Sequence, residues 1–310
     1  MTLRVPPAER SIPALLSFGV VNLDKPPGPS SHQIATWVNE LISEALAEQQ
    51  DGNSTKIGGV AHTGTLDPKV TGCLPLLLGD ATRAAQVFAD SHKEYVAVLE
   101  LHGPVPADFA ETLATFEAEI YQKPPRKSAV RRTLRTREIF ALDLLEREDR
   151  RVLLRIECEA GTYVRKLCHD LGLALGTGAH MGDLRRTATG QFDDSTLVTM
   201  EDLTDALAFW VEDGDETPLR EIVQPAEAAL TTLPRITIAP SAAREVANGA
   251  PVYAPGVIEA NAATVGDAEP VSGALVACYT PDGSAVCIGE LVGDPQGESG
   301  TVVELERVLV

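Results

Sequence analysis

The most informative stretch of this chain is His62-Thr63-Gly64-Thr65-Leu66-Asp67-Pro68-Lys69-Val70-Thr71-Gly72, which runs directly into the apolar segment Cys73-Leu74-Pro75-Leu76-Leu77-Leu78. An Asp followed by Pro is biased toward an extended or turn conformation. The flanking glycines allow the backbone to approach a ligand closely. A carboxylate presented in this way is a candidate nucleophile or general base, although an Asp-Pro pair in an arbitrary sequence more often only starts a turn.

Five further blocks stand in a fixed order around this stretch: Gly19–His32, Lys93–Ala97, Lys123–Arg132, Gly161–Arg165 and Gly178–Thr187. Together with the Asp67 segment, they resemble the TruB/dyskerin class of RNA pseudouridine synthases over about residues 18 to 310. The wording Lys-Pro-Pro-Gly-Pro-Ser-Ser-His at 25–32 is similar to the archaeal and eukaryotic dyskerin branch, the catalytic subunit of box H/ACA ribonucleoproteins.

The resemblance implies three catalytic residues. Asp67 is expected to be the nucleophile, and the resemblance leaves open whether it attacks the sugar or the base or abstracts a proton. Tyr95 is expected to stack on the target base and to help in a late proton transfer. Arg165 is expected to pair with the catalytic carboxylate, because a neighbouring guanidinium favours the charged form of an Asp.

Three further residues are implied as substrate-binding. His62 is expected to act as a wedge that holds the flipped-out nucleotide, since a base inside a helix cannot be reached until it is extruded. Leu184 is expected to line the apolar side of the base pocket, and Lys25 to support the floor of the active site. Without the resemblance, His62 and Leu184 would be interpreted as structural residues.

Composition describes a globular chain of 310 residues with 44% hydrophobic residues. The most apolar N-terminal stretch, Leu15 to Leu23, is short and lacks a small-residue cleavage site, so we interpret it as a strand and not as a signal peptide. No apolar run approaches the roughly 20 residues that span a bilayer. We expect a cytoplasmic protein with no membrane association.

The five cysteines contain no Cys-x-x-Cys pair and are expected to be buried core residues. No metal site is therefore predicted. Phosphate-loop and dinucleotide-binding patterns are also missing, and the reaction that the resemblance implies needs no cofactor.

The formal net charge of −19 and the pI near 4.7 are unusual for a protein that acts on RNA. The chain has only seven Lys against 19 Arg, and residues 233–310 hold ten acids, three Arg and no Lys. Extra carboxylates keep a protein soluble in concentrated salt by hydration and repulsion. We therefore infer a haloarchaeal source.

The exception to this acidity is the segment Lys123 to Arg137, which holds seven basic residues and no acid. Pro124 and Pro125 are expected to make it a stiff loop. We expect its cations to contact RNA backbone, and we name Arg126, Lys127, Arg131 and Arg132 as substrate-binding residues. The alternative is a solvated basic loop.

Helical spacing of apolar residues predicts an amphipathic helix from Ser31 to about Gln49, with Ser30 or Ser31 as N-cap. Further helices are predicted over Phe109–Ile120, Leu167–Leu175 and Met200–Val211. Strands are predicted over Tyr95–Leu101 and Arg151–Glu159. The sequence between Asp51 and Gly59 is expected to be a polar loop.

The character of the sequence changes near Leu233-Pro234, after which short apolar runs are separated by Gly and Pro. Strands are predicted there at 236–238, 252–253, 275–279, 286–291 and 302–309, which fits a small β-barrel and resembles the PUA RNA-binding domain. We predict an α+β fold: a catalytic domain over 1–232 with a mixed, mostly antiparallel sheet, then a PUA domain over 233–310.

The resemblance implies a reaction that isomerises uridine to pseudouridine, in rRNA as part of a guide ribonucleoprotein and at tRNA uridine 55. Implied partners are tRNA and rRNA substrates, an H/ACA guide RNA, and small H/ACA proteins including a kink-turn-binding ribosomal-type protein. The arm before Phe18 is short and the chain stops at Val310 without a basic tail, which leaves the strength of guide-RNA anchoring open. Two alternatives are a stand-alone, guide-independent tRNA synthase and a non-catalytic RNA-binding scaffold.

Overall fold

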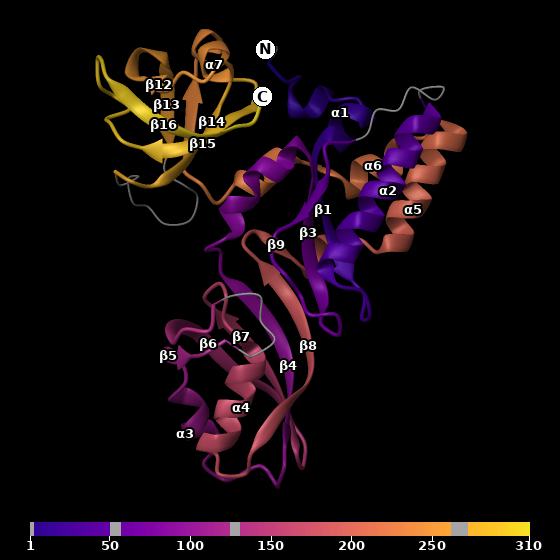
Figure 1. Cartoon of the computed structure of the whole chain (residues 1–310), viewed down its shortest axis with the longest axis vertical. Helices are drawn as coiled ribbons and strands as arrows, with labels where there is room; N and C mark the ends of the chain where they lie inside the picture. Colours follow the sequence, from indigo (N-terminus) through magenta and orange to yellow (C-terminus); the bar gives the residue numbers. More distant parts are fainter. Residues whose placement is uncertain (1–2, 50–56, 125–130, 262–271) are drawn as a thin grey trace.

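The computed structural model describes residues 3–49, 57–124, 131–261 and 272–310, which fold around two β-sheets (Figure 1). The larger sheet is long. It extends from the strand near the N-terminus to the region of helices α3 (Phe109–Ala114) and α4 (Val164–Ala174). The smaller sheet is formed by the C-terminal part of the chain and lies at one end of the larger one.

Ten strands form the larger sheet of the described chain. Along its main path they are β10 (Gln224–Pro225), β1 (Phe18–Lys25), β3 (Thr71–Gly79), β8 (Ala179–Thr189), β4 (Lys93–Leu101), β7 (Arg151–Cys158), β6 (Arg135–Arg147) and β5 (Glu119–Gln122). Off this path, β2 (Val60–His62) pairs with β3, and β9 (Phe192–Asp193) pairs with β8. Only β3 and β8 pair in parallel, so the predicted mixed, mostly antiparallel sheet is confirmed.

Helices cover this sheet. The α-helices of this part are α1 (Ile12–Ser17), α2 (Ser31–Gln49), α3 (Phe109–Ala114), α4 (Val164–Ala174), α5 (Met200–Ala208) and α6 (Thr217–Ile222). The shorter turns of 3-10 helix are at Pro7–Glu9, Asp80–Phe88, Asp194–Thr196 and Ala226–Leu230, and a π-helical turn follows α5 at Phe209–Asp213. Helices α2, α5 and α6 lie together beside β1 and β3 (Figure 1).

Helix α2 has the predicted bounds, and Ser30 is its N-cap. The Ser30 hydroxyl accepts a hydrogen bond from the backbone of Gln33 at 3.2 Å, while the Gln33 side chain accepts one from the Ser30 backbone at 2.9 Å. This reciprocal arrangement satisfies two donors that the first helical turn leaves without partners.

Two secondary-structure predictions are wrong in part. Leu15 to Ser17 belongs to α1, and the strand starts only at Phe18, because Leu15 and Leu16 are buried from a helix. The helix predicted over Phe109–Ile120 ends at Ala114, and Glu119–Gln122 forms edge strand β5, since pairing with β6 outweighs a helical pattern that buries only two residues.

The C-terminal sheet has the order β12 (Val252–Tyr253), β16 (Thr301–Val308), β15 (Ala285–Leu291), β14 (Leu275–Tyr279), β11 (Arg235–Ile238) and β13 (Val257–Asn261). All five predicted strands are present within one or two residues. Helix α7 (Pro240–Ala247), which was not predicted, and a 3-10 turn at Ala254–Gly256 connect them. Pro240 at the first helical position starts α7, and Ala243 and Val246 bury its inner face.

The two sheets share a hydrophobic core. One cluster of buried residues contains Phe18 and Leu77 of the larger sheet together with Tyr279, Ile288 and Leu309 of the C-terminal part. Burial of this contact excludes water from the junction and holds the two sheets together.

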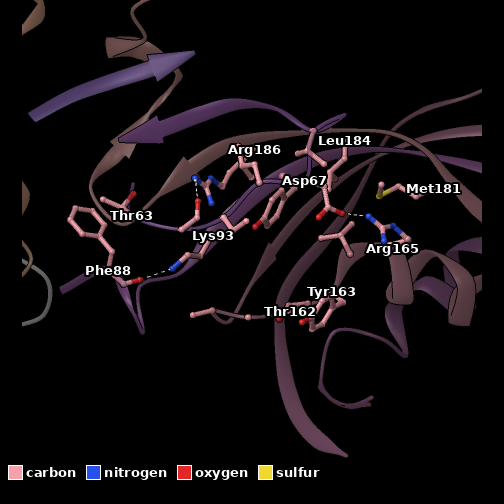
Figure 2. A pocket seen from close by; sticks show the side chains of 18 of the residues that line it. Thr63, Asp67, Phe88, Lys93, Thr162, Tyr163, Arg165, Met181, Leu184 and Arg186 are labelled. Carbon is pink, nitrogen blue, oxygen red and sulfur yellow. Dashed lines mark hydrogen bonds and ion pairs between the residues drawn. The ribbon is translucent and has the colours of Figure 1, made fainter. Parts of the chain in front are cut away.

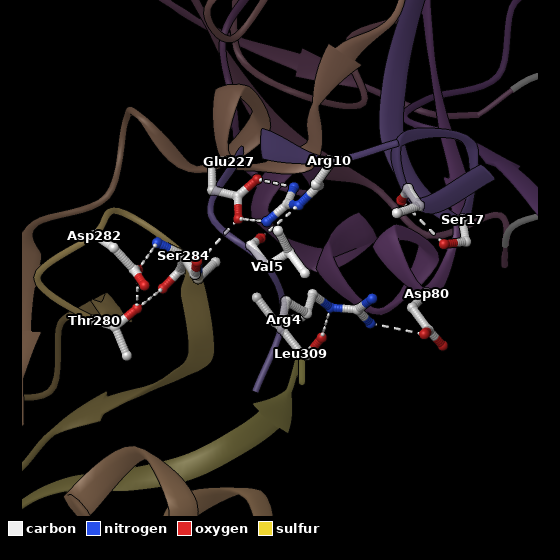
Figure 3. A network of polar contacts seen from close by, with 12 residues as sticks. Arg4, Val5, Arg10, Ser17, Asp80, Glu227, Thr280, Asp282, Ser284 and Leu309 are labelled. Atoms are coloured by element: carbon white, nitrogen blue, oxygen red, sulfur yellow. Dashed lines mark hydrogen bonds and ion pairs between the residues drawn. The ribbon is translucent and has the colours of Figure 1, made fainter. Parts of the chain in front are cut away.

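The N-terminal arm adds polar contacts to this junction (Figure 3). Arg10 is 2% exposed and donates two hydrogen bonds to Glu227, at 2.6 and 2.8 Å. Glu227 also accepts a hydrogen bond from the backbone of Ala285 at 3.0 Å. Arg4 donates to the Leu309 carbonyl and to the Asp80 carboxylate, both at 2.7 Å. The arm therefore connects the larger sheet to the C-terminal sheet.

None of the helices in the described part of the chain is long and apolar enough to cross a membrane.

Candidate active site

Asp67 lies in a tight turn between β2 and β3. The backbone N–H of Val70 donates to the Asp67 carbonyl at 2.9 Å and closes the turn around Pro68. Leu66 and Val70, on either side, are buried, while the Asp67 side chain is 55% exposed. The turn is thus anchored at both ends and presents its carboxylate outward.

Two residues of the opening segment hold this turn in place. Lys25 is fully buried, and its ammonium donates to the carbonyls of Pro26, Pro68 and Val70 at 2.9, 3.0 and 2.8 Å. Burial lowers the pKa of Lys25. Ser31 accepts from the Leu66 N–H at 2.8 Å and donates to the Leu66 carbonyl at 3.2 Å. Lys25 and Ser31 are therefore bonded to the turn that carries Asp67, although 35 to 45 positions separate the bonded residues in sequence.

Arg165 forms an ion pair with Asp67 from the first turn of α4 (Figure 2). The chain enters α4 through a sharp turn at Gly161, whose φ of +74° favours glycine. The buried side-chain amide of Gln122 then holds the backbone of Tyr163 in place. Its oxygen accepts a hydrogen bond from the Tyr163 N–H at 2.9 Å, and its nitrogen donates one to the Tyr163 carbonyl at 3.2 Å. The predicted pairing of Asp67 with Arg165 is therefore present.

A cavity of about 620 Å³ opens beside this ion pair. Its walls come from the Asp67 turn, from the strands β4 and β8, and from the start of α4. Tyr95 and Leu184 line it as predicted, together with Phe88, Tyr163 and Met181, which the sequence did not single out. A volume of this size is typical of a site that takes one small organic group.

The charges of this cavity are unlike those of the rest of the chain. Its lining includes four cations, Lys93, Arg135, Arg165 and Arg186, and one acid, Asp67. The whole chain has a net charge of −19. The described lining therefore has more positive than negative side chains, in contrast to the acidic chain as a whole.

Arg186 and Lys93 are buried cations that sequence reasoning missed. Arg186 is 1% exposed and donates to the carbonyls of Cys73 at 2.7 Å and Gly64 at 3.3 Å. Lys93 is 7% exposed and donates to the carbonyls of Phe88 at 2.9 Å and Ser91 at 2.5 Å. Burial and the nearby charge of Arg186 lower the pKa of Lys93 to about 8.

A signal for both residues was available. Side chains two positions apart on a strand lie on the same face of the sheet. If Leu184 and Tyr95 line a pocket, Arg186 and Lys93 are therefore expected to line it as well. Burial raises the pKa of Tyr95, while the charge of Arg186 acts in the opposite direction.

Three further predicted residues, His62, Arg131 and Arg132, are not among the residues that line the cavity. His62 is half-buried on β2, and burial together with the charges of Arg186 and His32 lowers its pKa. Arg131 and Arg132 are exposed, and Arg132 donates to the Pro124 carbonyl at 3.0 Å. The predictions for Arg126 and Lys127 lie outside the described residues. Of the basic segment, Arg135 reaches the cavity and lies over the Tyr163 ring at 5.4 Å.

All five cysteines are buried and none forms a disulfide. Within the described ranges, no group of three or more His, Cys, Asp or Glu side chains is placed to hold a metal ion.

Three family models match the chain. The TruB family pseudouridylate synthase N-terminal domain matches residues 53–108, the tRNA pseudouridylate synthase B C-terminal domain matches 165–231, and the DKCLD domain matches 4–35. The first match contains Asp67 and Tyr95, and the second begins at Arg165.

Known relatives match over the full length. The probable tRNA pseudouridine synthase B of Haloarcula marismortui is 66% identical over 310 residues, which is 100% of this chain and 94% of that protein. The crystal structure of a Cbf5-Nop10-Gar1 complex contains a chain that is 41% identical, with a TM-score of 0.88 over 99% of this chain and 90% of that one. An H/ACA RNP bound to a substrate RNA containing 2'-deoxyuridine contains a chain that is 40% identical, with a TM-score of 0.87 and the same coverage.

Proposed function

The chain belongs to the TruB family of pseudouridine synthases, which isomerise uridine to pseudouridine in RNA, and we propose that Asp67, Arg165 and Tyr95 carry out this reaction in the cavity described above. The observation that carries the assignment of residues is the Asp67–Arg165 ion pair at the mouth of a cationic cavity in a strongly acidic chain.

The reaction breaks the bond between N1 of uracil and C1' of ribose, turns the base, and joins C5 to C1'. Asp67 is the nucleophile, because it is the one carboxylate that lines the cavity. Arg165 holds that carboxylate in position. Because the Asp67–Arg165 ion pair is exposed, the Asp67 carboxylate stays accessible to a nucleotide that enters from solvent.

The detached base must be held while it turns. Tyr95 offers an aromatic face for stacking and Leu184 an apolar wall, and both line the cavity. The cavity is far too narrow for a duplex, so the target nucleotide enters flipped out of its helix. His62 stands next to the Asp67 turn, and we assign to it the wedge that fills the space left in the RNA.

We propose RNA substrates and partners from the relatives. The Haloarcula protein is named for tRNA, one matching solved chain belongs to a Cbf5-Nop10-Gar1 complex, and the other belongs to an H/ACA RNP bound to a substrate RNA. We therefore propose that this chain modifies rRNA as the catalytic subunit of a guide ribonucleoprotein, with proteins like Nop10 and Gar1, and also modifies tRNA. A stand-alone tRNA synthase is the second candidate, favoured by the names of the curated relatives.

The two sheets divide these tasks in our proposal. Residues 1–232 form the pseudouridine synthase domain, and residues 233–310 form a PUA domain that binds RNA. The change of sheet between β10 and β11 supports this division. We place the protein in the cytoplasm, where both kinds of RNA are modified.

Release of tritium from C5-labelled uridine in tRNA and rRNA transcripts tests the proposal, with the assay run in molar salt. Release from rRNA only when guide RNA and partner proteins are added is the expected result, and Asp67→Asn should prevent it. Release from tRNA alone, unchanged by guide RNA, would favour the stand-alone enzyme.

A further inference from the structure

Arg186 carries a charge that is buried and has no acidic partner. It is 1% exposed, and among the described residues no carboxylate lies within ion-pairing distance of it. Its neighbour on β8, Arg185, is by contrast paired with Asp24 through two hydrogen bonds of 2.9 and 3.1 Å. A buried unpaired charge is costly, so its presence beside a reaction centre calls for a functional reason.

The hydrogen bonds of Arg186 join three segments that form the site. Nε donates to Cys73 on β3, and one terminal nitrogen donates to Gly64 in the loop that leads to Asp67. Gly64 leaves little room, because a Cβ there would lie 3.2 Å from the guanidinium. These contacts hold the side chain in place among the residues that line the cavity (Figure 2).

The third neighbour is Tyr95. Tyr95 and Arg186 are direct partners in the pairing of β4 with β8, which brings their side chains to one face of the sheet. Both side chains also line the same cavity, and the charge of Arg186 lowers the pKa of Tyr95 against burial, which raises it. A guanidinium in this position stabilises a phenolate far more than a phenol.

Other charged groups share the cavity, namely Lys93 on β4, Arg135 on β6, Arg165 on α4 and Asp67. Of the described charged residues that line it, only Arg186 is the direct strand partner of Tyr95. The titratable groups that act on Tyr95 are Arg186 from β8, Cys158 from β7 and Cys73 from β3. Burial raises the pKa of both thiols to about 12, so both are neutral near pH 7. Arg186 is thus the charged group that adjoins Tyr95 on the neighbouring strand.

We propose that Arg186 is a positioning and electrostatic residue that enables Tyr95 to take the C5 proton of the rearranged base. This inference rests on the proposed function. Once C5 is bonded to C1', the C5–H bond breaks, and its electron pair forms the C5=C6 double bond. The N1=C6 π pair returns to N1, which gains a proton. The Tyr95 phenolate accepts the proton from C5 and gives one back to N1 directly or through water, so that Tyr95 ends unchanged.

The test compares two substrates in Arg186→Lys and Arg186→Gln, with Arg185→Lys as the matched control on the neighbouring residue of the same strand. Each RNA carries uridine or 5-fluorouridine at the target position, and single-turnover rates are measured from pH 6 to 10. Fluorine at C5 leaves no proton to remove, so 5-fluorouridine needs the earlier steps only.

We expect Arg186→Lys to slow uridine conversion about 100-fold, and Arg186→Gln to slow it more, while conversion of 5-fluorouridine to its rearranged product changes less than about threefold. The rising limb of the rate against pH should move to higher pH, because Tyr95 ionises less readily. In a Tyr95→Phe background, adding Arg186→Lys should slow uridine conversion little further. Arg185→Lys should leave both rates and the pH profile unchanged.

Equal slowing of both substrates with an unchanged pH profile would assign Arg186 to structure and overturn the proposal. Loss of the native circular dichroism spectrum in both variants would do the same. Failure of the proposed function has a different signature, since Asp67→Asn would then convert both substrates.

Discussion

Ser31, the first residue of α2, exchanges two hydrogen bonds with the backbone of Leu66, the residue that precedes Asp67. Both partners are buried. The opening segment and the Asp67 turn are therefore one structural unit, although 35 positions separate these two residues in sequence.

Ser31→Ala should lower both stability and turnover. The change leaves the N–H and C=O of Leu66 buried without these partners, at a cost of about 1–3 kcal/mol. Because the turn then loosens, kcat should fall by more than KM rises. Urea unfolding and single-turnover tritium release measure the two effects. Ser30→Ala is the control, since it removes an exposed N-cap at about 1 kcal/mol and should spare turnover.

Asp67→Asn should abolish isomerisation and leave RNA affinity nearly intact. The amide keeps the shape of the side chain and removes its negative charge, so the loss appears in turnover and not in binding. Filter binding and tritium release with the same RNA separate the two. Wild-type turnover in this variant would mean that another residue is the nucleophile.

Lys93 should make the stability of the folded chain rise with pH. Its folded pKa is about 8 against 10.5 for the free side chain. Between these values the unfolded chain binds the proton and the folded chain does not, so the free energy of unfolding increases. The full difference is up to about 3 kcal/mol. Denaturant titrations at pH 7 and pH 10 should show this gain in wild type and not in Lys93→Met. Parallel curves for the two proteins would contradict it.

Arg131→Glu combined with Arg132→Glu should weaken RNA binding and flatten its dependence on salt. Each lost phosphate contact lowers the salt slope by about one. The matched control reverses Arg150 and Arg151, two exposed cations of the β6–β7 hairpin, and should change neither quantity. Binding that stays the same at every salt concentration would reject a backbone contact.

Dilute buffer should loosen the fold, because the −19 charge then repels itself without screening. Circular dichroism across a salt titration measures this. RNA binding should show a shallower salt slope than in an archaeal relative that lacks the acidic surface, because stacking and hydrogen bonds replace counterion release. A chain equally folded and active in dilute buffer would overturn the halophilic interpretation.

Much of this structure could be predicted from the sequence. The bounds of α2 follow from regular apolar spacing and a serine cap, and the C-terminal strands follow from short apolar runs between Gly and Pro. Asp67, Tyr95 and Arg165 could be named because the motifs that contain them are specific. The Ser31–Leu66 contact could not, since it depends on how β1 and β3 pair.

Arg186 was missed for a physical reason. A pair of adjacent arginines in an RNA enzyme suggests two exposed phosphate contacts, and only the alternation of the strand shows that one of them is buried. Similarly, the helical pattern at Phe109–Ile120 is real, but pairing with β6 decides the conformation of its last residues.

The hydrogen bond from Arg4 to the Leu309 carbonyl joins residues 305 positions apart. A ribosome adding about 5–20 residues per second needs roughly 15–60 seconds to cover that distance. Throughout this time the N-terminal arm has been made but its partner has not. Strand β16 is the last to emerge, and the buried surface between the two sheets cannot close before it does. The larger sheet must therefore stay soluble with this surface open while the rest of the chain is synthesised, which makes translation speed a determinant of how much protein reaches its native form.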